Sequence, residues 1–589
     1  MIILDKELWR LEDIYQNQEE WEKSLKRAEA LLGDMERFQG KLGESADTFF
    51  DALDSSAQLE ELIVRVYSYA RMKLDEDNSN HSSQALFGRV AALLTRMETA
   101  ISFIVPEILA LPDGFVSGLR RDERFAAYSH LLDDILRQKP HTLSRAEELL
   151  VARAGEMART PDEVFKMLNN ADLAFPVIRD DEGKEIEITK GNFISLMQSK
   201  NRRVRLDAFQ ALYATYRKLE NTFAAALNAG VKRDIFYAKV RKHRSARSAS
   251  LFADKIPQAV YDSLVRTVRA NLGEMHRYMR LRKKVLGLDE LHMYDIYVPL
   301  ADVKWRVPYP EAVEMLKKGV AVMGDSYGKT LAEGLDAGWA DIYERKGKTG
   351  GAYCDSIYGV HPFLLLNYQD NLDSAFTLAH EMGHALHFYY SAAEQPFIYS
   401  NPAIFTAEVA STVHESLLME YLLQTVTDAH KKIYLLNYYL EIFRGTLFRQ
   451  TMFAELETII HEKAENGEAL TSHFLQEVYH DLNAAYHGPE MVVDAEIDME
   501  WARIPHFYNA FYVYKYATGL SAAVSLVRQM LSEGESAVAR YVSFLKKGGS
   551  DYPLALLQEA GVDMTSPRPV QDAVNRFSGL LDELEALCG

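Results

Sequence analysis

The most reactive combination of side chains in this sequence is the motif HEMGH at residues 380–384. It lies in a stretch with helical periodicity, residues 372–389, with Asn371 or Asp373 as its expected N-cap. Residues four apart lie on one face of an α-helix about one turn apart, so His380 and His384 can converge on one cation. Glu381 stands beside that cation, where it can take a proton from water. The motif therefore predicts a catalytic metal centre.

A catalytic zinc ion takes three protein ligands and keeps one position open. His387 lies seven residues beyond His380, about 10 Å along the helix, and cannot share the metal. Glu394 is too near the end of the same helix. Glu408, at the start of the helical stretch 405–423, is the predicted third ligand. The alternative is a surface acid that the helix dipole favours.

Glu415 lies two helical turns after Glu408, on the same face, and is predicted to orient a ligand histidine from behind. One zinc ion is the expected cofactor. Two histidines and a carboxylate would also suit cobalt or manganese.

The elements around this centre are mainly helical. Apolar residues at three- and four-residue spacing predict helices over residues 59–74, 144–157, 205–231 and 432–454. Ser144 and Glu147 resemble a capping box. Residues 175–180 and 185–189 predict a hairpin, and residues 352–354 and 362–368 predict a small β-sheet just before the metal-binding helix. The fold class is therefore mainly α, with an N-terminal helical region at 1–195 and a catalytic region at 196–589.

Composition excludes several classes of function. The chain has 589 residues and a formal net charge of −19, which disfavours nucleic acid and anionic membranes as partners. Two cysteines exclude a disulfide scaffold and fit a reducing compartment. The N-terminal segment lacks the features of a signal peptide, and no stretch reaches about 18 apolar residues. A cytoplasmic location is expected.

Three stretches resemble the M3 metallopeptidases, in particular their oligoendopeptidase F branch. They are LDSAFTLAHEMGH at 372–384, TAEVASTVHE at 406–415, and IPHFY at 504–508 continuing through FYVYKYATG at 511–519. The resemblance implies a prolate helical body with a deep channel and one zinc ion at its floor. It also implies that short peptides enter and that His380, His384 and Glu408 bind the metal, with Glu381 as general base.

The aromatic stretch is harder to assign. The resemblance implies that a histidine and tyrosines there hold the substrate and polarise its carbonyl. His506 and Tyr514 are the leading choices for catalysis, and Tyr508 and Tyr512 for substrate binding. The alternative is a packed helix face, since tyrosines at 508, 512 and 516 recur every four residues.

Residues 363–368 are predicted to form an edge strand that binds the peptide backbone, with Asn367 and Tyr368 as substrate contacts. The expected reaction is hydrolysis of internal peptide bonds, in which Glu381 deprotonates the attacking water and protonates the leaving amine. The rivals are a zinc exopeptidase and a non-catalytic peptide-binding scaffold. The oligomeric state is expected to be monomer or dimer.

Overall fold

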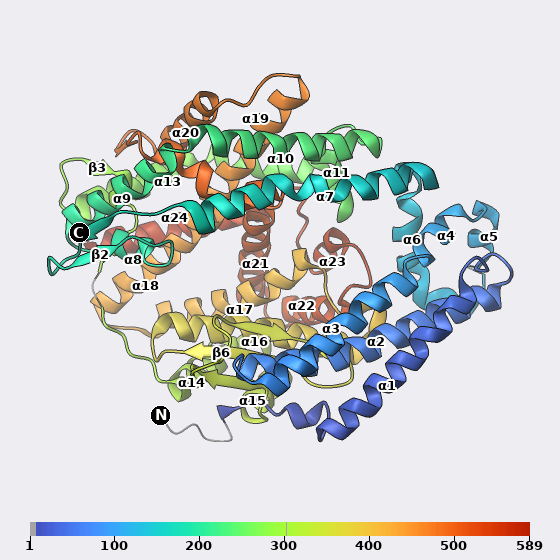
Figure 1. Cartoon of the computed structure of the whole chain (residues 1–589). Coiled ribbons are helices and arrows are strands. Elements are labelled where there is room, and N and C mark those ends of the chain that lie inside the picture. Colours follow the sequence, from blue (N-terminus) through green and yellow to red (C-terminus); the bar gives the residue numbers. More distant parts are fainter. Residues whose placement is uncertain (1–6, 120, 302, 589) are drawn as a thin grey trace. The chain divides into compact units, whose positions relative to one another are not determined.

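The computed structural model describes residues 7–119, 121–301 and 303–588, and residues 1–6 of the N-terminal segment lie outside this description (Figure 1). Within the described residues most of the chain is helical and the strands form three small sheets. This confirms the predicted mainly α fold with a small sheet beside the HEMGH helix.

The chain forms two compact units that are interleaved along the sequence. Unit 1 consists of Met1–Thr142, Trp305–Tyr421 and Leu526–Gly561, and unit 2 consists of Leu143–Lys304, Leu422–Ser525 and Val562–Gly589. The predicted regions 1–195 and 196–589 divide the chain differently, and that division stays a prediction.

The helices of unit 1 are α1 (Gln18–Asp34), α2 (Ala46–Glu76), α3 (His81–Ile101), α4 (Ile104–Ala110), α5 (Asp113–Leu119), α6 (Ser129–Arg137), α14 (Tyr309–Gly319), α15 (Asp325–Asp336), α16 (Leu372–Glu394), α22 (Glu535–Lys547) and α23 (Pro553–Glu559). Its strands are β4 (Ala340–Tyr343), β5 (Tyr353–Asp355) and β6 (Phe363–Tyr368).

The helices of unit 2 are α7 (Arg145–Met167), α8 (Phe193–Met197), α9 (Arg202–Arg217), α10 (Glu220–Val240), α11 (Ala246–Ala253), α12 (Gln258–Ala270), α13 (Leu272–Val285), α18 (Ala429–Ile442), α19 (Arg449–Glu465), α20 (Ser472–His487) and α24 (Arg568–Cys588). Its strands are β1 (Val177–Arg179), β2 (Glu185–Glu187), β3 (Leu291–His292) and β7 (Met491–Val492). Helices α17 (Ile404–Thr425) and α21 (Tyr514–Glu533) run across the unit boundaries.

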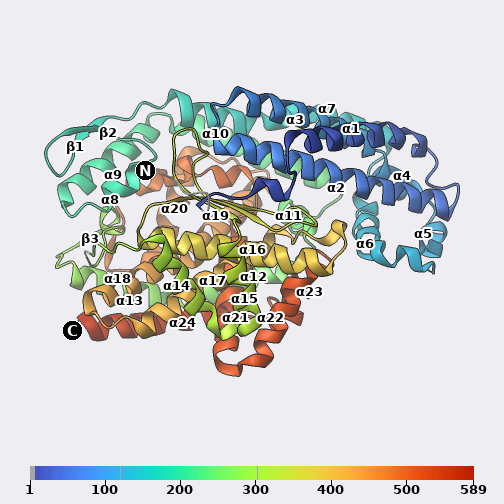
Figure 2. The same ribbon diagram turned by 90° about the horizontal axis from the view of Figure 1, so that it is seen from below.

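Helices α1, α2 and α3 pack side by side in unit 1 (Figure 1, Figure 2). Their inward faces are apolar, and Phe49, Ile63 and Val66 of α2 are completely buried. The same core reaches Phe363 and Leu365 of β6. The N-terminal helices therefore support the sheet that precedes α16.

The three-stranded sheet of unit 1 has the order β4-β6-β5, with β6 parallel to β4 and antiparallel to β5. The prediction of an edge strand at 363–368 is wrong, because β6 is the central strand and is paired on both sides. Its apolar run is typical of a strand that is covered on both faces. The edge strand that packs against α16 is β5.

Most predicted elements are present. The predicted helices 59–74 and 144–157 fall within or at the start of α2 and α7. The capping box is confirmed, since the Glu147 amide donates to Ser144 Oγ at 3.4 Å and the Ser144 amide donates to Glu147 Oε2 at 2.9 Å. The predicted hairpin is the antiparallel pair β1 and β2.

Two predicted helices are divided in the structure. The stretch 205–231 contains the end of α9 and the start of α10, and the stretch 432–454 passes through a π-helical turn, Phe443–Phe448, between α18 and α19. Both breaks leave the apolar face buried, so the apolar spacing in the sequence continues through them.

No single described helix combines the length and the hydropathy of a membrane-spanning segment, and only the bent pair His81–Ala110 with Asp113–Leu119 passes that test when its two parts are taken together.

Candidate metal centre

Helix α16 carries the HEMGH motif in unit 1. The side chain of Asn371 caps the helix by accepting a hydrogen bond from the Ser374 amide at 2.8 Å. The apolar residues around the motif are buried, which fixes the orientation of the helix. His380 and His384 therefore project from one face, and their Nε2 atoms lie 3.2 Å apart.

Helix α17 brings a carboxylate to the two imidazoles. Glu408 Oε2 lies 3.5 Å from His380 Nε2 and 3.7 Å from His384 Nε2. Tetrahedral zinc with bonds of about 2.0–2.1 Å places its donor atoms about 3.3 Å apart. The observed spacings are close to that value, and two imidazoles with one carboxylate form a donor set of a catalytic zinc site. The three side chains thus fit a single zinc ion.

Glycine lets the two helices approach closely at this point. A Cβ atom on Gly383 would lie 2.6 Å from Ser411 Cα and 2.7 Å from Ala410 O, both on α17. Real Cβ atoms do not come so close to a neighbouring backbone. The fourth residue of the motif therefore brings α17, and Glu408 with it, up to the histidines.

A second carboxylate orients the first histidine. Glu415, from α17, accepts a hydrogen bond from His380 Nδ1 at 2.8 Å. This bond leaves the Nε2 atom of His380 directed at the position between His384 and Glu408. Outer carboxylates of this kind fix the tautomer and the ring orientation of a ligand histidine.

The two imidazoles differ in their affinity for protons. Burial lowers the pKa of His380, but the hydrogen bond to Glu415 and the negative charges of Glu415, Glu381 and Glu408 together outweigh burial and raise the pKa to about 9. Burial, together with the charge on His380, lowers the pKa of His384 to about 3. At neutral pH His384 is therefore a neutral ring with a lone pair available for a metal.

Glu381 lies on the same helix but outside the three-donor cluster. Its side chain is buried, and burial raises its pKa to about 7, although the charge of His380 opposes this. A carboxyl group with a pKa near neutrality can both accept and release a proton at physiological pH. Its environment suits a general base.

One supporting contact in the site was not predicted. Tyr327 of α15 and His414 of α17 are both buried, and the Tyr327 hydroxyl lies 2.6 Å from His414 Nε2. His414 directly precedes Glu415 in α17, so this contact helps to hold Glu415 in position. His414 belongs to the motif at 406–415, but no sequence pattern marks a partner 87 residues away.

The side chains of Asn367 and Tyr368, at the end of β6, form hydrogen bonds with main-chain carbonyl groups of the protein. Asn367 Nδ2 donates to Thr349 O at 3.0 Å and to Gly351 O at 2.7 Å. The Tyr368 hydroxyl donates to Val307 O at 2.9 Å. Both residues also line a cavity of about 300 Å³ beside the N-terminus of α16. Their role in substrate binding stays a prediction.

The predicted aromatic residues belong to unit 2, where three rings form a half-buried cluster. His506 Nε2 lies 3.2 Å from the Tyr516 hydroxyl, and the His506 ring stacks on Tyr512 with centroids 6.1 Å apart. Tyr516 was not among the predicted site residues, although it continues the four-residue spacing of the tyrosines.

The other two tyrosines of this segment are buried. The Tyr508 ring stacks on the Phe165 ring with centroids 4.6 Å apart, and the centroids of the Tyr514 and Tyr261 rings lie 5.2 Å apart. Burial raises the pKa of Tyr508 and of Tyr514 above the ordinary value. The assignment of His506, Tyr508, Tyr512 and Tyr514 to the substrate stays a prediction.

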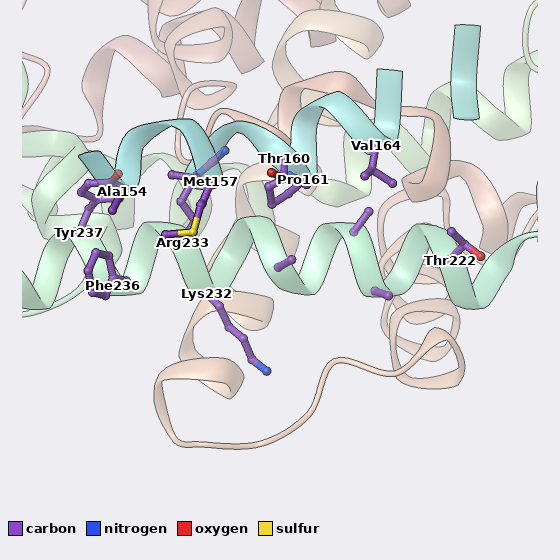
Figure 3. A pocket seen from close by; sticks show the side chains of 14 residues that line it. Ala154, Met157, Thr160, Pro161, Val164, Thr222, Lys232, Arg233, Phe236 and Tyr237 are labelled. Carbon is purple, nitrogen blue, oxygen red and sulfur yellow. The ribbon is translucent and has the colours of Figure 1, made fainter. Parts of the chain in front are cut away.

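A larger cavity of about 730 Å³ lies in unit 2 between α7 and α10 (Figure 3). Met157, Val164 and Phe236 give it an apolar lining. None of the three metal donors lines this cavity.

Known proteins match almost the whole chain. The sequence pattern of Peptidase family M3 matches residues 195–576, and that of Oligopeptidase F matches residues 107–175. Oligopeptidase PepF of Bacillus subtilis is 47% identical over 584 residues, which cover 99% of this chain and 87% of that protein.

Two crystal structures agree with these matches. A protein from Chlamydophila abortus has a TM-score of 0.94 and 32% identity, covering 99% of both chains. Oligoendopeptidase-F from Enterococcus faecium has a TM-score of 0.74 and 37% identity, covering 97% of this chain and 99% of its own. The matched patterns and relatives confirm the resemblance drawn from the three motifs, and the chain belongs to peptidase family M3, as a metalloendopeptidase of its oligoendopeptidase F branch.

Proposed function

We propose that this protein is a zinc-dependent endopeptidase that hydrolyses internal bonds of short oligopeptides, with Glu381 as the general base. The observation that carries this proposal is the convergence of His380, His384 and Glu408 on one point, with Glu381 on the same helix. The names of its relatives, oligopeptidase and oligoendopeptidase, support short peptides as the substrate class.

Zinc, when bound by these three side chains, polarises a peptide carbonyl and acidifies water. Glu381 takes the proton of the attacking water and delivers it to the leaving amine, and a pKa of about 7 suits both steps. Glu415 keeps Nε2 of His380 directed at the metal position. His506 and Tyr514 remain the proposed donors to the developing oxyanion, a contribution typically of about 3 kcal/mol per donor.

The substrate backbone is proposed to pair with β5, since β6 lies inside the sheet. An extended peptide that joins an edge strand gains main-chain hydrogen bonds with little dependence on its side chains. Weak sequence selectivity would follow. Tyr508, Tyr512, Asn367 and Tyr368 are the proposed contacts to the rest of the peptide. A cytoplasmic location and a monomer or dimer complete the proposal.

The test is cleavage of quenched peptides of graded length that are blocked at both ends. The proposed enzyme cuts them at internal bonds, loses activity in a chelator and regains it when zinc is added. An exopeptidase leaves doubly blocked peptides intact but cuts their unblocked versions. A peptide-binding scaffold cuts neither, and either of these last two results would overturn the proposal.

A further inference from the structure

Phe511 has an unusual backbone conformation. Its φ angle is +57°, in the left-handed region that bulky side chains rarely adopt. The residue lies between His506 and Tyr512 in the aromatic segment 506–516. A strained residue of this kind persists only where its surroundings hold it.

Several elements of unit 2 hold the main chain at this point. The Phe511 amide donates to Glu457 Oε1 of α19 at 2.7 Å, and Ala510 O accepts from Ser250 Oγ of α11 at 3.0 Å. The Phe511 ring is buried between His461 and Tyr261, with centroid distances of 4.6 and 5.9 Å. Consecutive main-chain groups are therefore held by side chains from two helices.

The carboxyl group of Glu457 is in an energetically unfavourable environment. It is completely buried, and it forms no ion pair within the described part of the chain. Its second oxygen, Oε2, has no hydrogen-bond partner there either. Burial raises its pKa well above the ordinary value, and the Phe511 amide only partly opposes this. An apolar side chain would fill the space at less cost, so the bond to the Phe511 amide is what distinguishes the carboxyl group.

We propose that Glu457 is a positioning residue that holds Phe511 in the left-handed conformation and thereby sets the relative positions of the His506, Tyr512 and Tyr516 rings. Because Phe511 separates His506 from Tyr512, a change of φ there redirects the chain between the two rings. The contacts between those rings, 3.2 Å from His506 Nε2 to the Tyr516 hydroxyl, depend on that path. The catalytic consequence rests on the proposed role of these rings in substrate binding.

Two variants of Glu457 separate the length of the side chain from its carboxyl group. Glu457→Gln keeps an oxygen at the length needed to accept a hydrogen bond from the Phe511 amide but has no ionisable group. Glu457→Asp keeps the carboxyl group but shortens the side chain by one methylene. We expect Gln to stay within about threefold of wild-type kcat/KM, and Asp to lose activity on the order of 100-fold, the scale of a misplacement of about 1 Å. The control is Glu462→Asp, the same change at an exposed position of α19.

Hydrogen exchange at the Phe511 amide is the second readout, and it does not need activity. Exchange should accelerate in Glu457→Asp and stay slow in Glu457→Gln and Glu462→Asp. Unchanged exchange in the Asp variant, or a Gln variant as impaired as the Asp variant, would overturn the proposal. If Glu457→Asp does not fold, Ser250→Ala, which removes the hydrogen bond to Ala510 O in the same peptide unit, must accelerate exchange at the Phe511 amide, and slow exchange there counts against the proposal. An inactive wild-type protein would instead contradict the proposed peptidase function, and hydrogen exchange would still test the role of Glu457.

Discussion

Glu381 and Glu415 show how environment assigns different tasks to two carboxyl groups of one site. Glu415 accepts a hydrogen bond from His380 Nδ1 and so acts as an orienting group. The Glu381 side chain makes no such hydrogen bond within the described residues, and burial raises its pKa to about 7. One carboxyl is committed to structure and the other is available for proton transfer.

Replacing Glu381 by Gln should separate metal binding from catalysis. The amide keeps the size of the side chain but cannot accept the proton, so kcat should fall by about 10²–10⁴-fold while zinc content stays at one ion per chain. Steady-state kinetics with metal analysis of the dialysed protein measures both. Normal cleavage by this variant would show that another group is the base.

Replacing Glu408 by Ala should instead weaken zinc binding itself. Loss of one of the three proposed ligands should weaken zinc binding by more than about 100-fold, beyond the 10–100-fold typical of an outer partner such as Glu415. Competition with a chelator of known affinity measures this for Glu408→Ala and Glu415→Gln together. Glu333→Ala, an exposed acid of α15, is the control. Unchanged zinc affinity in the first variant would place the third ligand elsewhere.

How far the site could be predicted depends on sequence distance. His380, Glu381 and His384 are one helical turn apart, so their convergence follows from helix geometry alone. Glu408 was predicted from its place at the start of the next helical stretch, which helix geometry alone does not bring to the histidines. The Tyr327–His414 contact joins residues 87 positions apart, and no local pattern indicates it. Tyr516 continues the four-residue spacing of Tyr508 and Tyr512, but this spacing does not distinguish a site residue from one on a packed helix face.

At the scale of elements, the contact between α16 and α17 sets the spacing of the three candidate metal donors. Gly383 removes the side chain that would keep the two helices apart, and the backbone of Ser411 occupies that space. The position of Glu408 relative to the histidines is therefore a property of helix packing.

Gly383→Ala should push α16 and α17 apart. Overpacking of this kind typically costs about 1–3 kcal/mol of unfolding free energy, and here it should also weaken zinc binding. Gly328→Ala is the matched control, since it changes a glycine of helix α15 with nothing within 4 Å of the added Cβ. Denaturant unfolding and zinc titration measure both effects. A Gly383→Ala protein with normal zinc affinity would contradict the role given to this contact.

The elements themselves were largely predictable, and their pairing was not. The run of apolar residues in β6 correctly predicts a strand, but it does not say which neighbours the strand has. Pairing with β4, which lies before β5 in the sequence, makes β6 central. The apolar spacing also did not indicate the break at 218–219 or the π-helical turn at 443–448, because the buried face continues through both of them.

At the scale of the molecule, the three proposed metal donors all belong to unit 1. Metal binding should therefore stabilise that unit directly. Zinc at about 100 times its dissociation constant should add about 2.7 kcal/mol, or about 100-fold slower exchange through unfolding of the unit.

Hydrogen exchange with and without a chelator tests this expectation. Removal of zinc should accelerate exchange in α16, whereas α19 of unit 2 should change much less. The Glu408→Ala protein is the control, because chelation should leave its α16 unchanged. Equal acceleration in both helices would contradict a stabilisation confined to unit 1.

The interleaving of the two units also has a consequence for biosynthesis. Helix α22, which packs against α16, begins at Glu535, and the final stretch of unit 2 follows it. During synthesis on the ribosome, α16 can therefore pack against α22 only after nearly the whole polypeptide has emerged. Nascent chains released before that point would expose apolar faces that chaperones bind.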